Sequence, residues 1–387
     1  MLLPHSSLAL QLNERTSLNV WFASSQLDGA IQTLAKEYSQ QYSAVQVNLV
    51  SIPNEDLKTS LIKTLNSGRA PDIAIFSSDN TVYAAQMRLS ALPNDLVEAG
   101  LSPLEYDAMR VNGRYFGLPI QRQNRMLLLY NKAIVSSPAK SWNRIMSQAD
   151  EFNAKSILPV GVLFGEGYWF GHFISLFSGQ LASEGQPQLN TTAMQESLIF
   201  YKHLSEINVI RENCGYDCVS IDFYKGNVAY AINGTWALKE AVDYLGDDLG
   251  IAELPTYDGQ AMKALASTVV MVFPNNSWHG SNQKAIQHFA QYLRSKEVQK
   301  QLSEMTLMLP LHDHSSYSPQ ARQWLDAQSA LRGSTTYMPA DPAFVSVWNA
   351  IRKGIRLYQS ETADAKQSAE YMQVVAEKIS AQVKGRE

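Results

Sequence analysis

Two short polar turns hold the side chains of this sequence that are best placed to bind a small ligand. Ser24–Gln26 follows the apolar run Leu18–Phe22, and Ser77–Asn80 follows the apolar run Pro71–Phe76. Both runs are typical of buried strands, and ligands of open α/β sheets bind outside the carboxyl ends of such strands. The hydroxyl, amide and carboxylate groups of these turns can then meet one ligand through hydrogen bonds.

Other chemistry leaves few signs in the chain. No G-x-G-x-x-G follows the first strand and no G-x-x-x-x-G-K-[ST] occurs, so we expect no dinucleotide or nucleoside triphosphate site. No G-x-S-x-G and no Cys–His arrangement is evident. His312 and His314 have a spacing that suits a metal ion, but no nearby third ligand accompanies them. We expect a loop there, and no metal or other cofactor.

Cys214 and Cys218 are the only two cysteines of the 387 residues. This number excludes a disulfide scaffold and a four-thiolate zinc site. The two residues lie in a polar segment where a tight turn is easy, and their spacing can satisfy the Cα separation that a disulfide requires. The alternative is a pair of free thiols in a cytosolic protein, and the spacing alone leaves both open.

The length and composition indicate a large globular protein of two or three domains. Hydrophobic residues make up 45% of the chain and charged residues 18%, which excludes a disordered or fibrous chain. The formal net charge is −4, which argues against a nucleic-acid binder, since such proteins normally carry a basic domain or stripe. No run of about 18 apolar residues occurs, so we expect no membrane span.

Residues 1–17 are expected to lie outside the folded domains. The segment Met1–Gln11 lacks the basic start and the long apolar core of a complete signal peptide. It is either the end of a signal sequence whose start lies upstream or an ordinary disordered terminus. The sequence alone leaves export open.

The elements that position the two polar turns alternate between strand and helix. Predicted strands cover 18–22, 45–49 and 71–76, and helical stripes of apolar residues cover 31–42 and 57–65. This alternation predicts an α/β fold with right-handed crossovers, a mostly parallel sheet and helices on both faces. Asp79 is expected to cap the helix that follows the third strand.

A second set of elements follows a polar break. Residues 121–125 separate a short predicted strand, 115–120, from the apolar run 126–130, which indicates a crossing between two domains. The later predicted elements are helices near 142–154, 168–180 and 193–207, strands at 228–232 and 268–273, and helix over the last 40 residues.

Short motifs in a fixed order carry a resemblance to a known family. They extend over nearly the whole chain and are Val20–Phe22, Gly68–Ile73, Asn112–Pro119, Tyr130–Lys132, Ser141–Trp142, Phe223–Trp236, Leu254–Pro255 and Val347–Arg352. Through the order and spacing of these motifs, the chain resembles the maltose-binding-type periplasmic solute-binding proteins of ABC sugar importers.

The resemblance implies a two-lobe periplasmic-binding-protein fold, in which two α/β lobes close around a ligand by bending at a hinge. It implies an N-terminal lobe made of 18–120 and 266–316 and a C-terminal lobe made of 121–265 and 317–387. The chain would cross between the lobes near 120–125, 262–267 and 313–320. Because the family is exported, the resemblance also favours a disulfide between the two cysteines and a periplasmic location.

The ligand-binding positions follow from the resemblance one residue at a time. Ser25 and Gln26 stand where the maltose binder has an Asp and a Lys, and Asn80 stands where it has an Arg. Asn124, or Gln123 if the alignment slips by one, stands where it has a Glu. The remaining implied positions match an aromatic, acidic or basic residue of the family, and they are Phe76, Asp79, Glu166, Tyr168, Trp236, Trp348 and Arg352.

Several of these side chains also have a purely structural interpretation. Asp79 can be only a helix cap, and Phe76 ends a buried strand. Trp236 and Trp348 can be core residues. Trp169 or Phe170 can bind ligand in place of Glu166 and Tyr168.

The residue types agree with a sugar ligand. A pyranose has an apolar face, which an indole or phenol ring covers, and a rim of hydroxyl groups, which carboxylate, amide and guanidinium groups pair. We therefore expect a monomer that binds a di- or oligosaccharide between its lobes and delivers it to a membrane ABC permease, without an enzymatic step.

Three other functions stay open. Arg122, Arg125 and Arg352 can add positive charge near the cleft, which would suit an anionic solute such as a uronate or a phosphorylated compound. Asp79 and Glu166 can be the acid and base of a carbohydrate-active enzyme, although nothing in the sequence sets their separation. The protein can also present a bound sugar to a membrane sensor.

Overall fold

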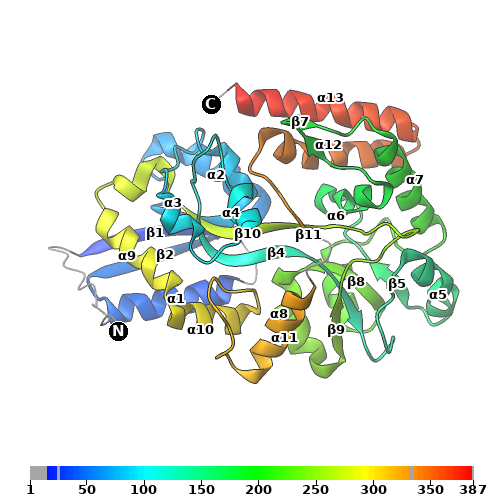
Figure 1. Ribbon diagram of the computed structural model, residues 1–387, viewed down its shortest axis with the longest axis horizontal. Coiled ribbons are helices and arrows are strands. Elements are labelled where there is room, and N and C mark those ends of the chain that lie inside the picture. The colour runs from blue at the N-terminus through cyan, green and yellow to red at the C-terminus, as the bar shows by residue number, and fades with distance from the viewer. Residues whose placement is uncertain (1–14, 24–26, 332–334, 386–387) are drawn as a thin grey trace.

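Strands and helices alternate along the chain in the computed structural model, which describes residues 15–23, 27–331 and 335–385 (Figure 1). The strands are β1 (Thr16–Ala23), β2 (Val45–Ile52), β3 (Ile73–Ser77), β4 (Leu118–Asn131), β5 (Leu158–Gly161), β6 (Ala182–Ser183), β7 (Gln186–Pro187), β8 (Val228–Gly234), β9 (Leu249–Ala252), β10 (Ala264–Val272) and β11 (Thr335–Tyr337). The helices are α1 (Leu27–Gln41), α2 (Asn54–Thr64), α3 (Asn94–Glu98), α4 (Pro103–Ala108), α5 (Trp142–Ala154), α6 (Gly167–Gly171), α7 (Thr192–Glu206), α8 (Leu238–Leu245), α9 (Gln283–Arg294), α10 (Lys296–Thr306), α11 (Pro319–Ala330), α12 (Pro342–Gln359) and α13 (Ala365–Lys384).

A mixed sheet runs through the molecule in the strand order β2-β1-β3-β10-β4-β8-β5. The first three strands are parallel, as their alternation with helices predicted. β10 is antiparallel to both β3 and β4, and β8 is antiparallel to β4 but parallel to β5. Helices cover both faces of this sheet (Figure 1).

Each half of the sheet has its own hydrophobic core. The first core packs β1, β2 and β3 against α1 and α9 and includes Phe22 and Phe289. The second core packs the other half against α5, α7, α12 and α13 and includes Trp142 and Tyr201. Burial of these large side chains supplies the main driving force for folding each half.

Two long strands connect the halves. β4 pairs with β10 up to Arg125 and with β8 from Met126 onward. β10 pairs with β11 over Ala264–Ala266 and with β3 over Val269–Val272. Both strands therefore change partners near the first two crossings that we expected, while the lobe boundaries given above stay a prediction.

The polar segment 121–125 does not break a strand, contrary to our expectation. β4 continues through it, because its polar side chains find partners inside the protein. Gln121, for example, donates a hydrogen bond to the hydroxyl of Thr306 at 2.7 Å. A run of polar residues therefore marks the crossing without ending the strand.

Two helix predictions are wrong in detail. The helix expected at 168–180 is divided into α6 and a 3₁₀ helix (Phe173–Phe177), because α6 ends at Gly171, a residue type of low helix propensity. The segment after β3 is a 3₁₀ helix, η2 (Ser78–Tyr83), which begins before Asp79. Asp79 is therefore a first-turn residue of η2 and not its cap.

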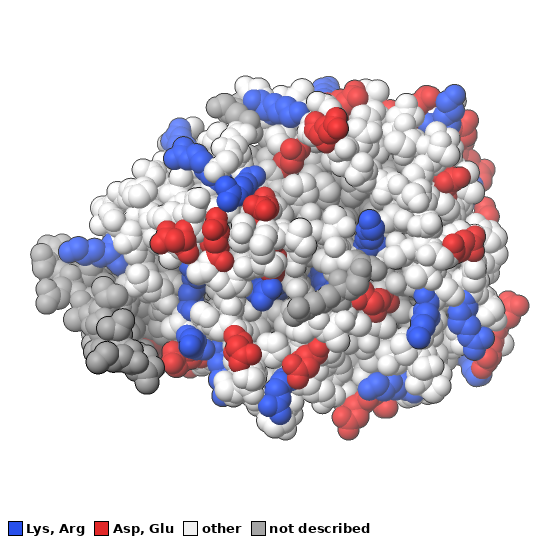
Figure 2. Space-filling model, in the orientation of Figure 1, with Lys and Arg blue, Asp and Glu red and all other residues white. Residues whose placement is uncertain are grey.

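Charged side chains of both signs are interspersed over the face shown in Figure 2. This mixture differs from the basic stripe of a nucleic-acid binder. In the described part of the chain, no helix is both long and apolar enough to cross a membrane.

Candidate functional site

Three aromatic side chains from separate segments form a cluster in the half of the molecule that holds the second core. Tyr168 lies on α6, Trp236 on the short 3₁₀ helix Thr235–Ala237 after β8, and Trp348 on α12. The ring centroid of Tyr168 lies 5.5 Å from that of Trp348 and 6.3 Å from that of Trp236. All three side chains are only partly buried, whereas Trp142 is fully buried in the second core.

Glycines give these rings their space. A Cβ atom on Gly171 would lie 2.9 Å from the Trp348 ring, and one on Gly167 would overlap the carbonyl of the same tryptophan. A Cβ atom on Gly234 would overlap the ring of Trp236. These glycines are therefore required by close packing against the two indoles.

The phenol of Tyr168 joins the aromatic cluster to the connecting strand β10. Its hydroxyl donates a hydrogen bond to the carbonyl of Leu265 at 2.9 Å. Burial raises the pKa of Tyr168, and the charge of Asp79 raises it further. Asp79, which follows a strand of the first half, is therefore close enough to act electrostatically on a ring of the second half.

A chain of hydrogen bonds leads to the carboxylate of Asp79. The Asn124 amide donates to the Ser267 hydroxyl at 3.3 Å, the Ser267 and Ser77 hydroxyls lie 2.7 Å apart, and the Ser77 hydroxyl donates to Asp79. Each hydroxyl has one proton, so the whole chain is satisfied when every donor points toward Asp79. Strands β4, β10 and β3 are linked in this way at the place where β4 and β10 connect the halves.

The pKa of the Asp79 carboxyl rises from 3.8 to about 6. Burial is the main cause, since the residue is 7% exposed. The Ser77 hydrogen bond and the charge of Lys58 act in the opposite direction. Lys58 lies over the Tyr83 ring, with its Nζ 4.3 Å from the centroid. The Asp79 carboxylate is therefore ionised at neutral pH and can accept hydrogen bonds, although the burial of its charge destabilises the folded protein.

Glu166 and Arg352 form an ion pair at 2.8 Å, between the residue that precedes α6 and the middle of α12. Their side chains are 37% and 40% exposed, so the pair borders the aromatic cluster at the surface. The Glu166 carboxylate and the Arg352 guanidinium therefore lie beside Trp348, and each neutralises the charge of the other.

The other two arginines that we considered as anion ligands are engaged elsewhere. Arg122 forms a salt bridge with Glu105 at 2.6 Å. Arg125 is 1% exposed, and its guanidinium donates to the Thr335 hydroxyl at 2.7 Å and to the Gln328 carbonyl at 2.9 Å. Both arginines therefore stabilise the region where β4 passes from one half to the other.

Of the other predicted positions, Phe76 and Asn80 do not join the cluster in the same way. Phe76 is 5% exposed and belongs to the first core. Packing in this core is a sufficient reason for an aromatic residue at this position. Asn80 donates a long hydrogen bond to the Ser77 carbonyl at 3.5 Å. Ser25 and Gln26 lie outside the described residues.

The structure also places Gln123 and Trp169, which were alternatives to neighbouring predicted positions. Gln123 is buried and has a φ of 49°, so it lies on the strained backbone of the crossing, and Asn124 makes the contact with Ser267. Trp169 is 8% exposed and donates to the Ile232 carbonyl at 2.8 Å, which is the environment of a core residue.

Sequence reasoning missed Ser77, Ser267 and Lys58 as individual site residues. Ser77 lies in a turn that was singled out, so its location carried a usable signal. Ser267 lies in an apolar strand and Lys58 on α2, and only the packing of these elements brings them to Asp79.

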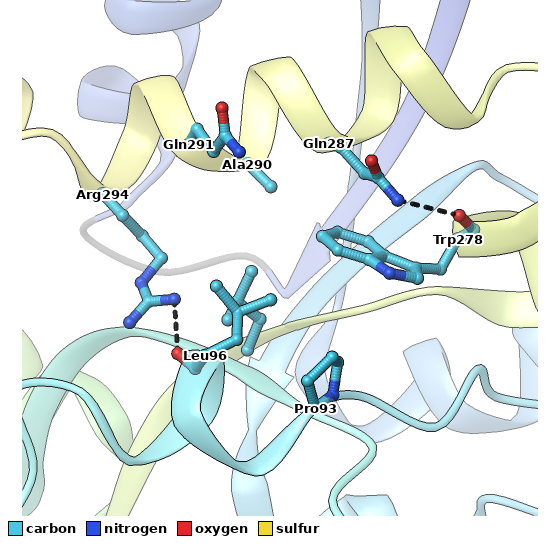
Figure 3. A pocket seen from close by; sticks show the side chains of 8 residues that line it. Pro93, Leu96, Trp278, Gln287, Ala290, Gln291 and Arg294 are labelled. Atoms are coloured by element: carbon cyan, nitrogen blue, oxygen red, sulfur yellow. Dashed lines mark hydrogen bonds between the residues drawn. The ribbon is translucent and has the colours of Figure 1, made fainter.

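A cavity of about 340 Å³ lies between α3 and α9 in the first half of the molecule, and none of its lining residues belongs to the aromatic cluster (Figure 3). Its lining residues are Pro93, Leu96, Leu118, Trp278, Gln287, Ala290, Gln291 and Arg294. Arg294 donates to the Leu96 carbonyl at 2.7 Å and so ties α9 to α3. We interpret this cavity as a packing gap between these helices.

The two cysteines and the two histidines have structural roles. Cys214 and Cys218 form a disulfide with a Cα separation of 5.3 Å. His312 bonds the Arg294 carbonyl at 2.9 Å, and His314 contacts the Asp326 carboxylate at 3.0 Å. Within the ranges that the structure describes, no three His, Cys, Asp or Glu residues lie together as a metal site.

Residues 24–300, more than half of the chain, match the family model described as "Bacterial extracellular solute-binding protein". The chain belongs to this family. Both the predicted family and the predicted fold class are thereby confirmed, since solved structures of the same fold cover nearly all of this solute-binding protein. One is the maltose/maltodextrin-binding domain MalE from Bdellovibrio bacteriovorus bound to maltotriose, with a TM-score of 0.83 and 21% identity over 94% of this chain and 99% of that one.

Two further relatives show how distant the similarity is. The GacH receptor of Streptomyces glaucescens, solved unliganded and with acarbose, has a TM-score of 0.83 and 17% identity over 95% of the solute-binding protein and 99% of the receptor. The maltotriose-binding protein of Pyrococcus abyssi is 24% identical over 233 residues, which are 58% of this chain and 50% of the relative. The chain thus spans about half the length of this curated relative.

Proposed function

We propose that the protein binds a neutral oligosaccharide between its two halves and delivers it to the permease of an ABC importer outside the cytoplasm. The observation that carries this proposal is the cluster of Tyr168, Trp236 and Trp348 with Asp79 next to it. Partly exposed rings provide the apolar surface that a pyranose face requires, and Asp79 provides an acceptor for its hydroxyl groups.

The relatives support the class of ligand. One curated relative is named for maltotriose, and the structures of similar fold were solved with maltotriose and with acarbose. All three names point to short chains of sugar rings. A cluster of two indoles and a phenol fits a ligand of more than one ring, because each aromatic side chain can cover one pyranose face.

The charges favour a neutral ligand over the anionic alternative. Arg352 is paired with Glu166, Arg122 is paired with Glu105, and Arg125 is buried in contact with neutral groups. An anionic ligand would have to compete with existing partners for these guanidinium groups and would also meet the carboxylate of Asp79.

Ligand binding is coupled to closure. Open and closed forms are in equilibrium, and a ligand that contacts both halves shifts the population toward the closed form. The strands β4 and β10 are suited to the hinge, since they carry the chain between halves that have separate cores. The closed monomer then docks on the permease, or on a membrane sensor if the sugar is a signal.

Isothermal titration calorimetry with glucuronate, maltose, maltotriose and a longer maltodextrin tests the proposal. We expect binding of at least one neutral oligosaccharide and compaction by small-angle X-ray scattering when it binds. Binding of glucuronate alone would favour the anionic alternative. Release of shorter sugars during incubation would show a carbohydrate-active enzyme, and no binding to any sugar would contradict the proposal.

A further inference from the structure

The C-terminal helix α13 is anchored in the second core. Met372 belongs to that core and packs against Gly354 of α12, where a Cβ atom would have no room. The Gln373 side chain accepts from the Leu189 amide at 2.7 Å and donates to the Pro187 carbonyl at 3.0 Å. Most of α13 therefore moves with the half that carries Trp236 and Trp348.

The last turn of the same helix reaches the other half. Val383 is 5% exposed and belongs to the first core. Its carbonyl accepts a hydrogen bond from Nε2 of Gln86 at 3.2 Å. In Figure 1, α13 begins over the second half and its C-terminal end lies toward the helices of the first half. One rigid helix thus contacts both cores.

The residues that receive this turn are connected to the candidate site. Gln86 follows η2, which carries Asp79, and its Oε1 has no hydrogen-bond partner among the described residues. The N-terminal part of α12, the helix of Trp348, also packs against the first core through Val345. Separation of the halves would therefore expose Val383 and break the Gln86 hydrogen bond.

We propose that Val383 and Gln86 form a closure latch, a contact away from the ligand that stabilises the closed form and so strengthens ligand binding. The inference rests on the proposed function, because the latch has an effect on affinity only if closure and binding are coupled. Any contact made in the closed form alone shifts the population toward that form and lowers the apparent dissociation constant. Val383 and Gln86 are positioning residues in this sense and do not contact the ligand.

The test compares Val383→Ala and Gln86→Ala with Val374→Ala, a matched control on the same helix whose side chain is 63% exposed. Maltotriose binding is measured by calorimetry and stopped-flow fluorescence, and the ligand-free radius of gyration by small-angle scattering. We expect Val383→Ala to raise the dissociation constant about 3- to 10-fold, mainly through faster dissociation, and to expand the ligand-free protein. The conservative variant Val383→Ile keeps an apolar side chain at this position and should retain the wild-type values.

A different set of results would overturn the latch. If Val383→Ala lowers the melting temperature but leaves the dissociation constant and the radius of gyration equal to those of Val374→Ala, the residue has only a structural role. If the wild-type protein binds no sugar, the proposed function fails, but scattering of the ligand-free variants still decides whether Val383 holds the halves together.

Discussion

The ring of Tyr168 lies edge-on to the ring of Trp348, with an interplanar angle of 74°. α6 and α12 approach closely enough for this contact because Gly167 and Gly171 face the tryptophan. The Glu166–Arg352 pair, between the residue that precedes α6 and the middle of α12, lies at the surface of the same contact. The aromatic surface and its charged border are therefore parts of one helix–helix contact.

Removal of an indole should weaken sugar binding more than it weakens the fold. Trp348→Ala and Trp236→Ala each remove a partly exposed ring, and we expect a loss of about 1–3 kcal/mol in binding free energy, measured by calorimetry with maltotriose. Tyr244→Ala, at a side chain 62% exposed on α8, is the control and should change nothing. Equal affinity in all three variants would place the ligand elsewhere.

The glycines that face the rings should be intolerant of alanine. Gly171→Ala and Gly234→Ala would force Trp348 and Trp236 out of position, with a loss of about 1–3 kcal/mol in unfolding free energy and a weaker affinity for maltotriose. Gly165→Ala is a matched control, because its Cβ would meet no atom within 4 Å. Urea denaturation and calorimetry measure both effects, and a Gly171→Ala variant as stable as Gly165→Ala would contradict the packing argument.

Sugar affinity should depend on pH through Asp79. Burial raises its pKa to about 6, so the residue is ionised at pH 7.5 and mostly protonated at pH 5. Hydrogen bonds to a charged acceptor are stronger than those to a neutral one, and we expect affinity for maltotriose to fall about tenfold between these pH values. The Asp79→Asn variant should bind weakly with a flat profile. A wild-type profile as flat as that of the variant would exclude Asp79 from the site.

The free energy of unfolding should change with pH in the opposite direction to sugar affinity. Because the folded pKa exceeds the ordinary value of 3.8, the folded protein retains this proton while the unfolded chain loses it. The contribution of Asp79 to the unfolding free energy therefore decreases as pH rises from about 4 to about 6. Asp79→Asn should stabilise the ligand-free protein at pH 7.5 by up to about 3 kcal/mol, and the gain should disappear below about pH 4. Urea denaturation at several pH values measures this difference.

The Glu166–Arg352 pair should have a small effect on a neutral ligand. Both side chains are more than one third exposed, so Arg352→Ala should reduce maltotriose affinity by at most about 1 kcal/mol. If the ligand is instead a uronate that binds through this guanidinium, the same substitution should abolish its binding. Calorimetry with maltotriose and glucuronate on wild type and variant separates the two cases.

The disulfide should stabilise its surroundings without affecting binding. The loop that it closes is short, and the chain-entropy relation gives about 2 kcal/mol for its removal. Urea denaturation of Cys214→Ala/Cys218→Ala, compared with the oxidised wild type, tests this value. Unchanged maltotriose affinity is expected, because Cys214 packs with Val219 and Phe223 in a separate cluster. A large loss of affinity would indicate that this cluster supports the site.

The features that the sequence alone determined are local or repeat over short distances. Strands β1, β2 and β3 and the helices between them follow from apolar periodicity, which each segment expresses by itself. The disulfide joins residues close enough in the chain to meet in one turn, but the spacing only allowed this bridge and the family resemblance favoured it. The ligand-binding roles of Trp236 and Trp348 were predicted from the family motifs around them and not from their own residue type, and they stay predictions.

Tertiary structure decided the contacts between segments far apart in the chain. β10 has an apolar pattern compatible with a central strand in any direction, and only packing made it antiparallel to both neighbours. The link from Asn124 through Ser267 to Asp79 needs three strands in register. The engagement of Arg122 and Arg125, and the contact of Val383 with the first core, likewise depend on which surfaces meet, and this is decided by burial over the whole chain rather than by local sequence.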